Sequence, residues 1–224
     1  MPLTVLYRDA ALAVVDKPAG LPVEADSKES VLALCARLLA PPSGRAWPRV
    51  VHRLDTDTSG CLVLALSKRA EARLLAAFEA GTINKEYLAL ISGEPPDEGA
   101  FDTPYGQDPR DKRRFTTKLQ TARRARLGFK VEERLRGAAL VRVILDTGRT
   151  HQIRVQFGEA GFPVLGDAAY GVPGPIARQA LHAERLSLLL AAEGAGPQAT
   201  PAQTTDCRAP VPDDFAAALA SLRR

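Results

Sequence analysis

Cysteines, long apolar runs and clustered metal-binding side chains are all scarce in this sequence of 224 residues. The three cysteines, Cys35, Cys61 and Cys207, lie far apart, and none belongs to a Cys-x-x-Cys arrangement. This pattern argues against a disulfide framework and a cysteine zinc site, and it favours a reducing compartment. No stretch approaches the roughly 20 apolar residues of a membrane-spanning helix, and residues 1–17 do not resemble a signal peptide. We therefore predict a cytoplasmic protein without a metal or a membrane partner.

A local excess of positive charge is the main feature of the composition. The formal net charge is only +4, but residues 105–154 contain 14 Lys/Arg and 5 Asp/Glu. Eight of these bases fall between Arg110 and Arg126. A run of like charge is often a solvated face or a loose loop, whereas segregation of one sign is also typical of a surface that binds a polyanion. We favour nucleic acid as the partner.

Apolar periodicity and turn residues predict a mixture of strands and helices. Strands are expected over residues 4–7, 12–15, 61–66, 87–91 and 180–189, and a long hairpin over 119–133 and 139–146. Helices are expected over 29–39, with Asp26 or Ser27 as cap, and from the cap Ser67 to the stop Gly81. Residues 93–108 are predicted to form a loop and residues 193–203 a linker. With few helices and many adjacent strands, the fold class is α+β with a largely antiparallel sheet.

The most informative motif is residues 52–60, which read His-Arg-Leu-Asp-Thr-Asp-Thr-Ser-Gly and precede an apolar strand. This placement puts Asp55 in a loop at the edge of a sheet, where a substrate could reach it. Arg53 is close enough to favour the ionised form of Asp55. Residues 56–60 are also common turn formers, so a plain turn is the alternative.

Two further segments gather polar side chains. Lys85 and Tyr87 share one face of a predicted strand, although such a tyrosine can also simply pack in the core. Residues 148–154 read Gly-Arg-Thr-His-Gln-Ile-Arg and follow another predicted strand. If a helical turn begins there, His151 and Arg154 share a face. The alternative is a surface helix that carries scattered charge.

Together these motifs resemble those of the RluA family of pseudouridine synthases. The resemblance rests, in order and spacing, on residues 16–21, 52–60, 85–87, 148–154, 165–171 and 181–183. It implies a mixed, largely antiparallel, bisected sheet with flanking helices and a central RNA-binding cleft, formed by one catalytic domain over residues 1–224. It also implies isomerisation of uridine to pseudouridine in RNA.

The resemblance implies roles for individual residues as well. Asp55 is expected to be the catalytic carboxylate, Arg154 its ion-pair partner and Tyr87 the ring that stacks on the target base. Arg53 would take the place of the flipped-out base in the RNA stack. We expect further RNA contacts from the other basic and histidine side chains of these segments, namely His52, Lys85, Arg149, His151, Arg113, Arg114, Arg123 and Arg124.

Two positions depart from the family pattern. Gln156 stands where members often have His, and Phe162 stands where many have the His of Gly-His-Pro. Neither is assigned to chemistry. The motifs begin almost at the first residue, so we expect the single-domain branch without an amino-terminal RNA-binding module. We expect a monomer that acts on a stem-loop of ribosomal RNA or tRNA.

Pseudouridine formation breaks the bond from C1′ to N1 and rejoins the uracil through C5, so no cofactor is needed. One carboxylate can attack as a nucleophile or remove a sugar proton to open a glycal route, and the sequence favours neither. A binding protein without catalysis is an alternative, although the intact Asp55, Tyr87 and Arg154 argue against it. A hydrolase that pairs Asp55 with Asp57 is less favoured, because residues i and i+2 of a turn poorly flank one bond at roughly 5–9 Å.

Overall fold

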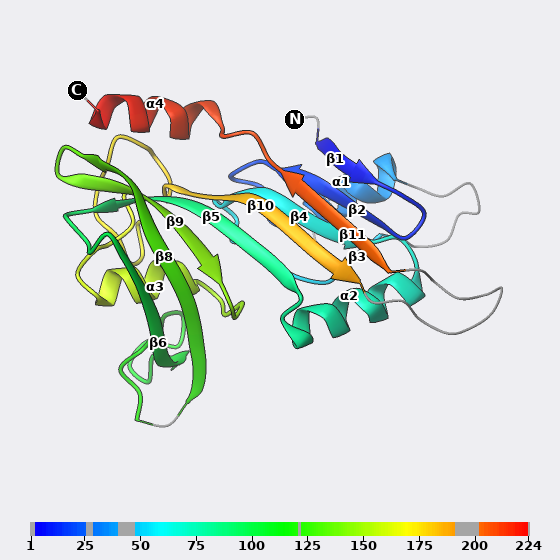
Figure 1. The fold of residues 1–224 in the computed structure, drawn as a ribbon, viewed down its shortest axis with the longest axis horizontal. Helices are drawn as coiled ribbons and strands as arrows, with labels where there is room; N and C mark the ends of the chain where they lie inside the picture. Colours follow the sequence, from blue (N-terminus) through cyan, green and yellow to red (C-terminus); the bar gives the residue numbers. More distant parts are fainter. Residues whose placement is uncertain (1–2, 26–28, 40–47, 121, 191–201, 224) are drawn as a thin grey trace. The chain divides into compact units, whose positions relative to one another are not determined.

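The computed structural model describes residues 3–25, 29–39, 48–120, 122–190 and 202–223 (Figure 1). The chain divides into two compact units, of which the first contains Met1–Lys85 and Ala183–Pro210 and the second Glu86–His182 and Val211–Arg224. Each unit has its own strands and helices. The single catalytic domain expected from the sequence stays a prediction.

The sheet of the first unit combines strands from the start of the chain with two strands from its later part. Its strand order is β1 (Thr4–Arg8), β2 (Leu12–Lys17), β4 (Ser59–Ala65) and β10 (Leu181–Leu190), with β11 (Gln203–Arg208) paired to β10 and β3 (Arg49–Val50) to β4. Antiparallel ladders join β1 to β2, β2 to β4 and β10 to β11. Alternate apolar side chains of these strands, such as Leu12, Val63 and Leu186, form a core with Leu74 of α2 (Lys68–Ala80).

In the described part of the first unit, α1 and α2 both begin at a serine cap. In α2 the Ser67 hydroxyl accepts from the Ala70 N–H, and Gly81 ends the helix in the left-handed conformation, as predicted. In α1 (Val31–Leu38) the cap is Ser30, whose hydroxyl accepts from the Ala33 N–H. The predicted cap at Asp26 or Ser27 is therefore wrong, because the helix begins later and the Ser30 side chain reaches its first turn.

Gly60 permits a close backbone approach at the start of β4. Its φ is +114°, and a Cβ atom there would lie 2.2 Å from the carbonyl oxygen of Ala183 on β10. Only glycine combines this conformation with the absence of a side chain. The polar turn that contains Asp55 therefore enters the sheet through a position that excludes other residue types.

The second unit is built around a second set of antiparallel ladders. Its strand order is β5 (Ile83–Ser92), β9 (Ala138–Leu145), β8 (Arg123–Leu135), β6 (Glu98–Gln107) and β7 (Phe115–Thr116). The predicted β8–β9 hairpin is confirmed. The loop predicted over residues 93–108 is wrong, because β6 pairs with β8 from Glu98 opposite Lys130 to Tyr105 opposite Arg123. The glycine, proline and acidic residues of β6 are typical of a loop, but the segment forms a strand because it pairs with a partner that is distant in sequence.

Among its described residues the second unit also contains the helices α3 (Gln152–Glu159) and α4 (Asp213–Leu222). Phe157 of α3 makes edge-type contacts with Phe101 and Phe129, with ring centroids 5.2 and 5.1 Å apart. Neither α4 nor β11 was predicted, although Asp213 and Asp214 in the first turn of α4 are a helix-start signal. Most of the predicted linker over 193–203 lies outside the described residues.

The predicted α+β class with a largely antiparallel sheet is confirmed. Among the described residues, no helix combines the length and apolarity needed to cross a membrane.

Candidate functional site

Asp55 lies in a tight turn that leads into β4 in the first unit. The Thr58 N–H donates to the Asp55 carbonyl at 3.1 Å. Asp55 is half-buried, whereas its neighbours Thr56 and Asp57 are exposed. The turn was predicted, and it leaves the Asp55 side chain partly accessible to solvent.

Lys17 and its neighbours support this turn from the adjacent strand. Lys17 ends β2 opposite Gly60, and its side chain is fully buried. Its ammonium group donates to the carbonyls of Pro18 at 2.8 Å, Leu21 at 2.7 Å and Thr56 at 2.6 Å. The Gly20 N–H also donates to the Thr56 carbonyl, at 3.0 Å. Because a buried ammonium group requires such acceptors, residues 16–21 tie the backbone next to Asp55 to β2.

His52 makes contacts within the first unit that the sequence did not suggest. Its Nε2 accepts from the Val63 N–H at 3.0 Å, and its ring lies 4.8 Å from that of Phe78. Burial, together with the positive charge of Lys85, lowers the pKa of His52 to about 3, so the ring is neutral near pH 7. These contacts give His52 a structural role, and its contact with RNA stays a prediction. Lys85 itself lies over the Phe78 ring, at 5.8 Å from the centroid.

Arg154 lies on α3 in the second unit and forms a buried, bidentate ion pair with Asp167. The Nε and Nη2 atoms of Arg154 lie 2.6 and 2.8 Å from the two carboxylate oxygens. Burial alone would raise the pKa of Asp167, but Arg154 and the N–H groups of Ala169 and Tyr170 hold it below its usual range. Two parallel hydrogen bonds fix the plane of a guanidinium group. Asp167 was missed as a partner, although it belongs to the motif over residues 165–171.

Tyr87 is buried on β5, opposite Val143 of β9. Its burial agrees with a packed strand tyrosine, and its stacking on a base stays a prediction. Asp55 belongs to the first unit, and Tyr87 and Arg154 belong to the second. That the three act on one nucleotide is therefore a proposal.

His151 adopts an uncommon backbone conformation directly before α3. Its φ is +58°, and among the described residues it is the only non-glycine residue with a positive value. Such conformations cost about 1 kcal/mol or more and often occur at functional sites. The helical turn considered near Thr150 forms, but it begins at Gln152, so His151 is the residue that precedes the helix and only Arg154 is part of it. The Gln152 side-chain oxygen accepts from the Arg149 N–H at 3.0 Å, which holds the segment before the helix.

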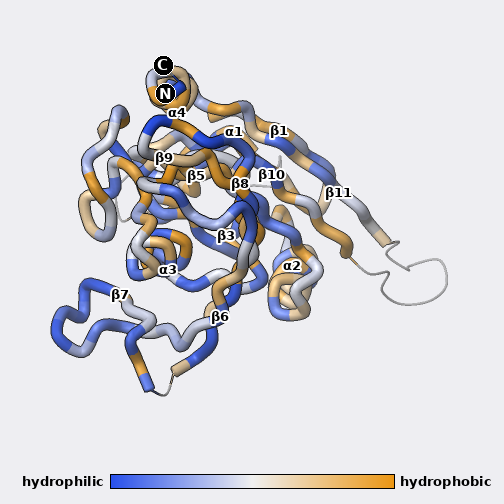
Figure 2. Tube along the Cα trace, turned by 60° about the vertical axis from the view of Figure 1, so that its left-hand side comes forward, coloured by the Kyte–Doolittle hydropathy of each residue, from blue (hydrophilic) through white to orange (hydrophobic). Residues whose placement is uncertain are grey.

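Part of the basic segment, by which we mean residues 110–126, is folded onto α3. Glu159 accepts from the Thr116 hydroxyl at 2.7 Å and from the Thr117 N–H at 2.8 Å. The Tyr170 hydroxyl accepts from the Phe115 N–H at 3.0 Å. The alternative of a loose, solvated loop is therefore wrong for residues 115–117. Figure 2 shows how hydrophilic the neighbouring loop between β6 and β7 is.

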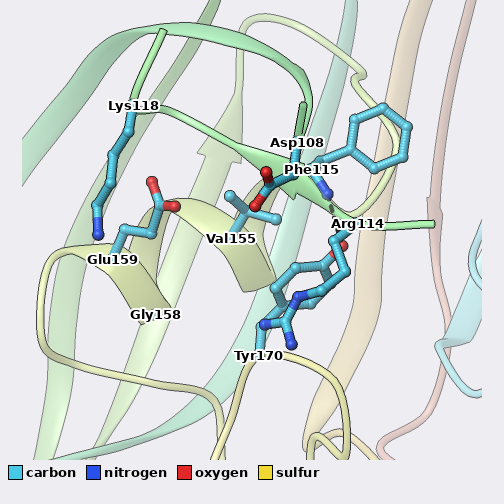
Figure 3. Close-up of a pocket in the computed structure, with 8 residues that line it drawn as sticks. All are labelled: Asp108, Arg114, Phe115, Lys118, Val155, Gly158, Glu159 and Tyr170. Atoms are coloured by element: carbon cyan, nitrogen blue, oxygen red, sulfur yellow. Dashed lines mark hydrogen bonds between the residues drawn. The ribbon is translucent and has the colours of Figure 1, made fainter. Parts of the chain in front are cut away.

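A pocket of about 380 Å³ lies where this segment meets α3 (Figure 3). It is lined by both charged and aromatic side chains from the second unit: Asp108, Arg114, Phe115, Lys118, Val155, Gly158, Glu159 and Tyr170. In the close-up, the Arg114 guanidinium lies against the Tyr170 ring, and Lys118 extends toward Glu159.

The predicted RNA-binding arginines differ in their surroundings. Arg113 pairs with Asp111, and Arg124 pairs with Asp102, both at exposed positions. Exposed ion pairs of this kind contribute little free energy. Each arginine can therefore exchange its carboxylate partner for an RNA phosphate at a low cost in free energy. Arg123 is exposed at the start of β8.

Residues 11–159 match the family model described as RNA pseudouridylate synthase. The chain belongs to this family. The family expected from the motifs is therefore confirmed. Asp55, Tyr87 and Arg154 all lie within the matched residues, whereas Asp167 and Tyr170 follow them.

Curated relatives of this pseudouridylate synthase family extend the similarity over the whole chain. A protein named ribosomal large subunit pseudouridine synthase D from Nitrosomonas europaea is 36% identical over 236 residues, covering 100% of this chain and 66% of the relative. The protein of the same name from Xanthomonas campestris is 36% identical, covering 100% of this chain and 70% of the relative. The chain thus spans about two thirds of the length of these relatives.

Two solved structures share the fold of this chain. Human RNA Pseudouridylate Synthase Domain Containing 4 superposes with a TM-score of 0.76 at 23% identity, covering 98% of this chain and 93% of that one. Human RNA Pseudouridylate Synthase Domain Containing 1 gives 0.75 at 23% identity, covering 94% and 84%.

Among the described residues of this pseudouridylate synthase family member, no three His, Cys, Asp or Glu side chains lie together in a way that could hold a metal ion.

Glu159→Gln is expected to release the basic segment from α3, because an amide cannot accept from Thr116 and Thr117 as a carboxylate does. Although burial opposes it, hydrogen bonds from these threonines hold the pKa of Glu159 below its ordinary 4.5. The depressed pKa means that the carboxylate stabilises the segment above pH 4.5 and loses this effect as the pH falls through the lower folded-state value. Hydrogen exchange of residues 115–117 at neutral pH should be faster in the variant than in the wild type.

Exchange is compared with the intrinsic rate at each pH: this protection should fall on acidification in the wild type and stay constant in the variant over that range. Glu79→Gln, an exposed glutamate near the end of α2, is the matched control and should leave the exchange unchanged. Equal protection in wild type and Glu159→Gln would show that the Glu159 contacts do not hold the segment.

Proposed function

We propose that this chain isomerises uridine to pseudouridine in RNA, with Asp55 as the carboxylate that acts on the target nucleotide. The observation that favours this proposal most strongly is the set of hydrogen bonds that holds the turn containing Asp55. Lys17 and Gly20 both bind the Thr56 carbonyl, so the backbone beside a partly accessible carboxylate is fixed within the segment that matches the family. Preorganised groups of this kind lower an activation barrier more than mobile ones do.

The remaining residues have supporting roles in this proposal. Arg154, oriented by Asp167, stabilises the ionised form of Asp55 in the complex with RNA. Tyr87 receives the flipped-out base on its ring, and Arg53 fills the space that the base leaves. Asp55 either forms a bond to the sugar or removes a sugar proton, and both routes conserve all atoms of the nucleotide.

We propose a stem-loop of large-subunit ribosomal RNA as the substrate. The names of the relatives from N. europaea and X. campestris favour ribosomal RNA over tRNA. Arg149 and His151, which lie directly before α3, would add RNA contacts next to those of the basic segment.

Incubation of the purified chain with unmodified transcripts of large ribosomal RNA tests the proposal. We expect pseudouridine at one or a few uridines, detected by chemical mapping and mass spectrometry. Binding without product would favour the RNA-binding alternative. Release of free uracil would favour the hydrolase.

Replacing Arg113, Arg123 and Arg124 with Ala should weaken RNA binding and leave the rate of turnover at saturating RNA unchanged. Each phosphate contact in single-stranded RNA changes the slope of log K against log salt by about 0.7, so three lost contacts should flatten it by about 2. Arg114 is kept, because it contacts Tyr170. Binding titrations between low and physiological salt, combined with single-turnover assays, measure both quantities.

The charge-matched control replaces Arg37, Arg49 and Arg69, exposed arginines of the first unit, with Ala. This control variant should keep most of the wild-type slope of log K against log salt. An unchanged slope in the first triple variant would mean that RNA binds elsewhere.

A further inference from the structure

Tyr170 contacts three groups that the proposed function treats separately. Its ring centroid lies 5.2 Å from the guanidinium carbon of Arg154 and 4.9 Å from that of Arg114. Its hydroxyl accepts from the Phe115 N–H at 3.0 Å and lies 3.1 Å from Nδ1 of His151. One side chain thus touches the arginine of α3, the residue with the uncommon φ before α3, and the basic segment.

The Tyr170 hydroxyl can form hydrogen bonds with His151 and with Phe115 at the same time. Burial raises the pKa of Tyr170, so the phenol stays protonated near neutral pH. A phenol has one proton to donate and lone pairs to accept. It can therefore donate to Nδ1 of His151 while it accepts from the Phe115 N–H.

The backbone of Tyr170 is fixed by the group that orients Arg154. One Asp167 carboxylate oxygen accepts the N–H groups of Ala169 at 2.9 Å and Tyr170 at 3.2 Å and also binds Arg154. The loop packs closely on α3, since a Cβ atom at Gly158 would lie 2.8 Å from the Tyr170 carbonyl oxygen. The ring therefore has little freedom to move without moving Arg154 or the basic segment.

We propose that Tyr170 is a positioning residue that couples RNA binding by the basic segment to the placement of Arg154. This inference rests on the proposed function. Two guanidinium groups next to one ring repel each other, and the negative face of the ring and the Asp167 carboxylate offset this repulsion. An RNA phosphate that binds Arg114 neutralises its charge and holds its guanidinium group against the ring, so that the ring, and through it Arg154, is held in place.

The alternative is that Tyr170 only fills space beside Tyr105, Ala125 and Val155, against which its ring packs. A space-filling role would alter stability and leave the rate of the bound complex unchanged. If Tyr170 positions Arg154, its replacement should also lower the rate at saturating RNA, and this loss distinguishes the two roles.

The test compares Tyr170→Leu, Tyr170→Phe and Arg114→Ala in single-turnover assays over a range of RNA concentrations. Tyr170→Leu removes the ring and should lower the rate at saturating RNA by roughly 10- to 100-fold. Tyr170→Phe keeps the ring beside both arginines and should restore most of that rate. Arg114→Ala should lower the affinity and also the rate at saturation, unlike the triple variant of Arg113, Arg123 and Arg124.

Arg114→Ala added to Tyr170→Leu should lower the rate no further, because the ring that connects Arg114 to Arg154 is already missing. Tyr7→Phe removes a hydroxyl that binds Asp9 in the first unit and is the matched control, with no change expected. A wild type that forms no pseudouridine would contradict the proposed function, and the inference with it. With an active wild type, either of two results would overturn the inference alone: a full rate at saturation in Arg114→Ala, or equal losses in Tyr170→Leu and Tyr170→Phe. Arg114 is exposed, so its variant gives a result even if Tyr170→Leu does not fold.

Discussion

Asp55→Asn is expected to lower the rate of pseudouridine formation by about 10⁴-fold or more, as the removal of an essential nucleophile or base does in other enzymes. An amide has the shape of the carboxylate but can neither attack the sugar nor take a proton from it. RNA affinity and the melting temperature should stay close to those of the wild type, because the turn is held by backbone groups of Asp55, Thr56 and Thr58.

Asp57→Asn is the matched control for this variant. Asp57 is an exposed carboxylate two residues away in the same turn, and its amide variant should keep nearly full activity. A strong loss in Asp57→Asn would favour the paired-carboxylate alternative, and a near wild-type rate in Asp55→Asn would contradict the assignment of Asp55.

Lys17→Met is expected to lower both stability and turnover. The methionine fills most of the volume, but the carbonyls of Pro18 and Leu21 lose their charged donor, whereas the Thr56 carbonyl keeps the Gly20 N–H. Acceptors left without a partner cost about 1–3 kcal/mol each when buried, and Pro18 and Leu21 are only half-buried, so we expect a total loss of about 3 kcal/mol. For a chain of this size, that corresponds to a fall in melting temperature of roughly 10 °C.

Turnover should fall as well, because the turn beside Asp55 loses its link to β2. Thermal unfolding and single-turnover rates measured below the lowered melting temperature separate the two effects. Lys68→Met, an exposed lysine at the start of α2, is the control and should change neither quantity. Full stability in Lys17→Met would show that the three hydrogen bonds are not needed to hold the turn.

Local signals in the sequence predicted local structure well. The cap Ser67 and the stop Gly81 define α2, and the hydrophobic pattern predicts the β8–β9 hairpin. Each of these features depends on residues that are close in sequence. The turn containing Asp55 is also a local feature, since its hydrogen bond joins Asp55 to Thr58, three residues later.

Features that depend on distant partners were missed. The composition of β6 suits a turn and predicts a loop, whereas pairing with the distant strand β8 satisfies its backbone groups. Lys17 and Thr56 are 39 residues apart, so no local pattern indicates their hydrogen bond. The motif that contains Asp167 was recognised, but its pairing with Arg154 depends on how the loop folds back onto α3.

Mapping of pseudouridine in total RNA from a strain that lacks this gene, compared with its parent, tests the central claim most directly. The deletion strain should lose pseudouridine at one or a few uridines of large-subunit ribosomal RNA. A plasmid that supplies the wild-type chain should restore these positions, and one that supplies Asp55→Asn at the same protein level should not. Identical maps in parent and deletion strain, or restoration by Asp55→Asn, would contradict the account.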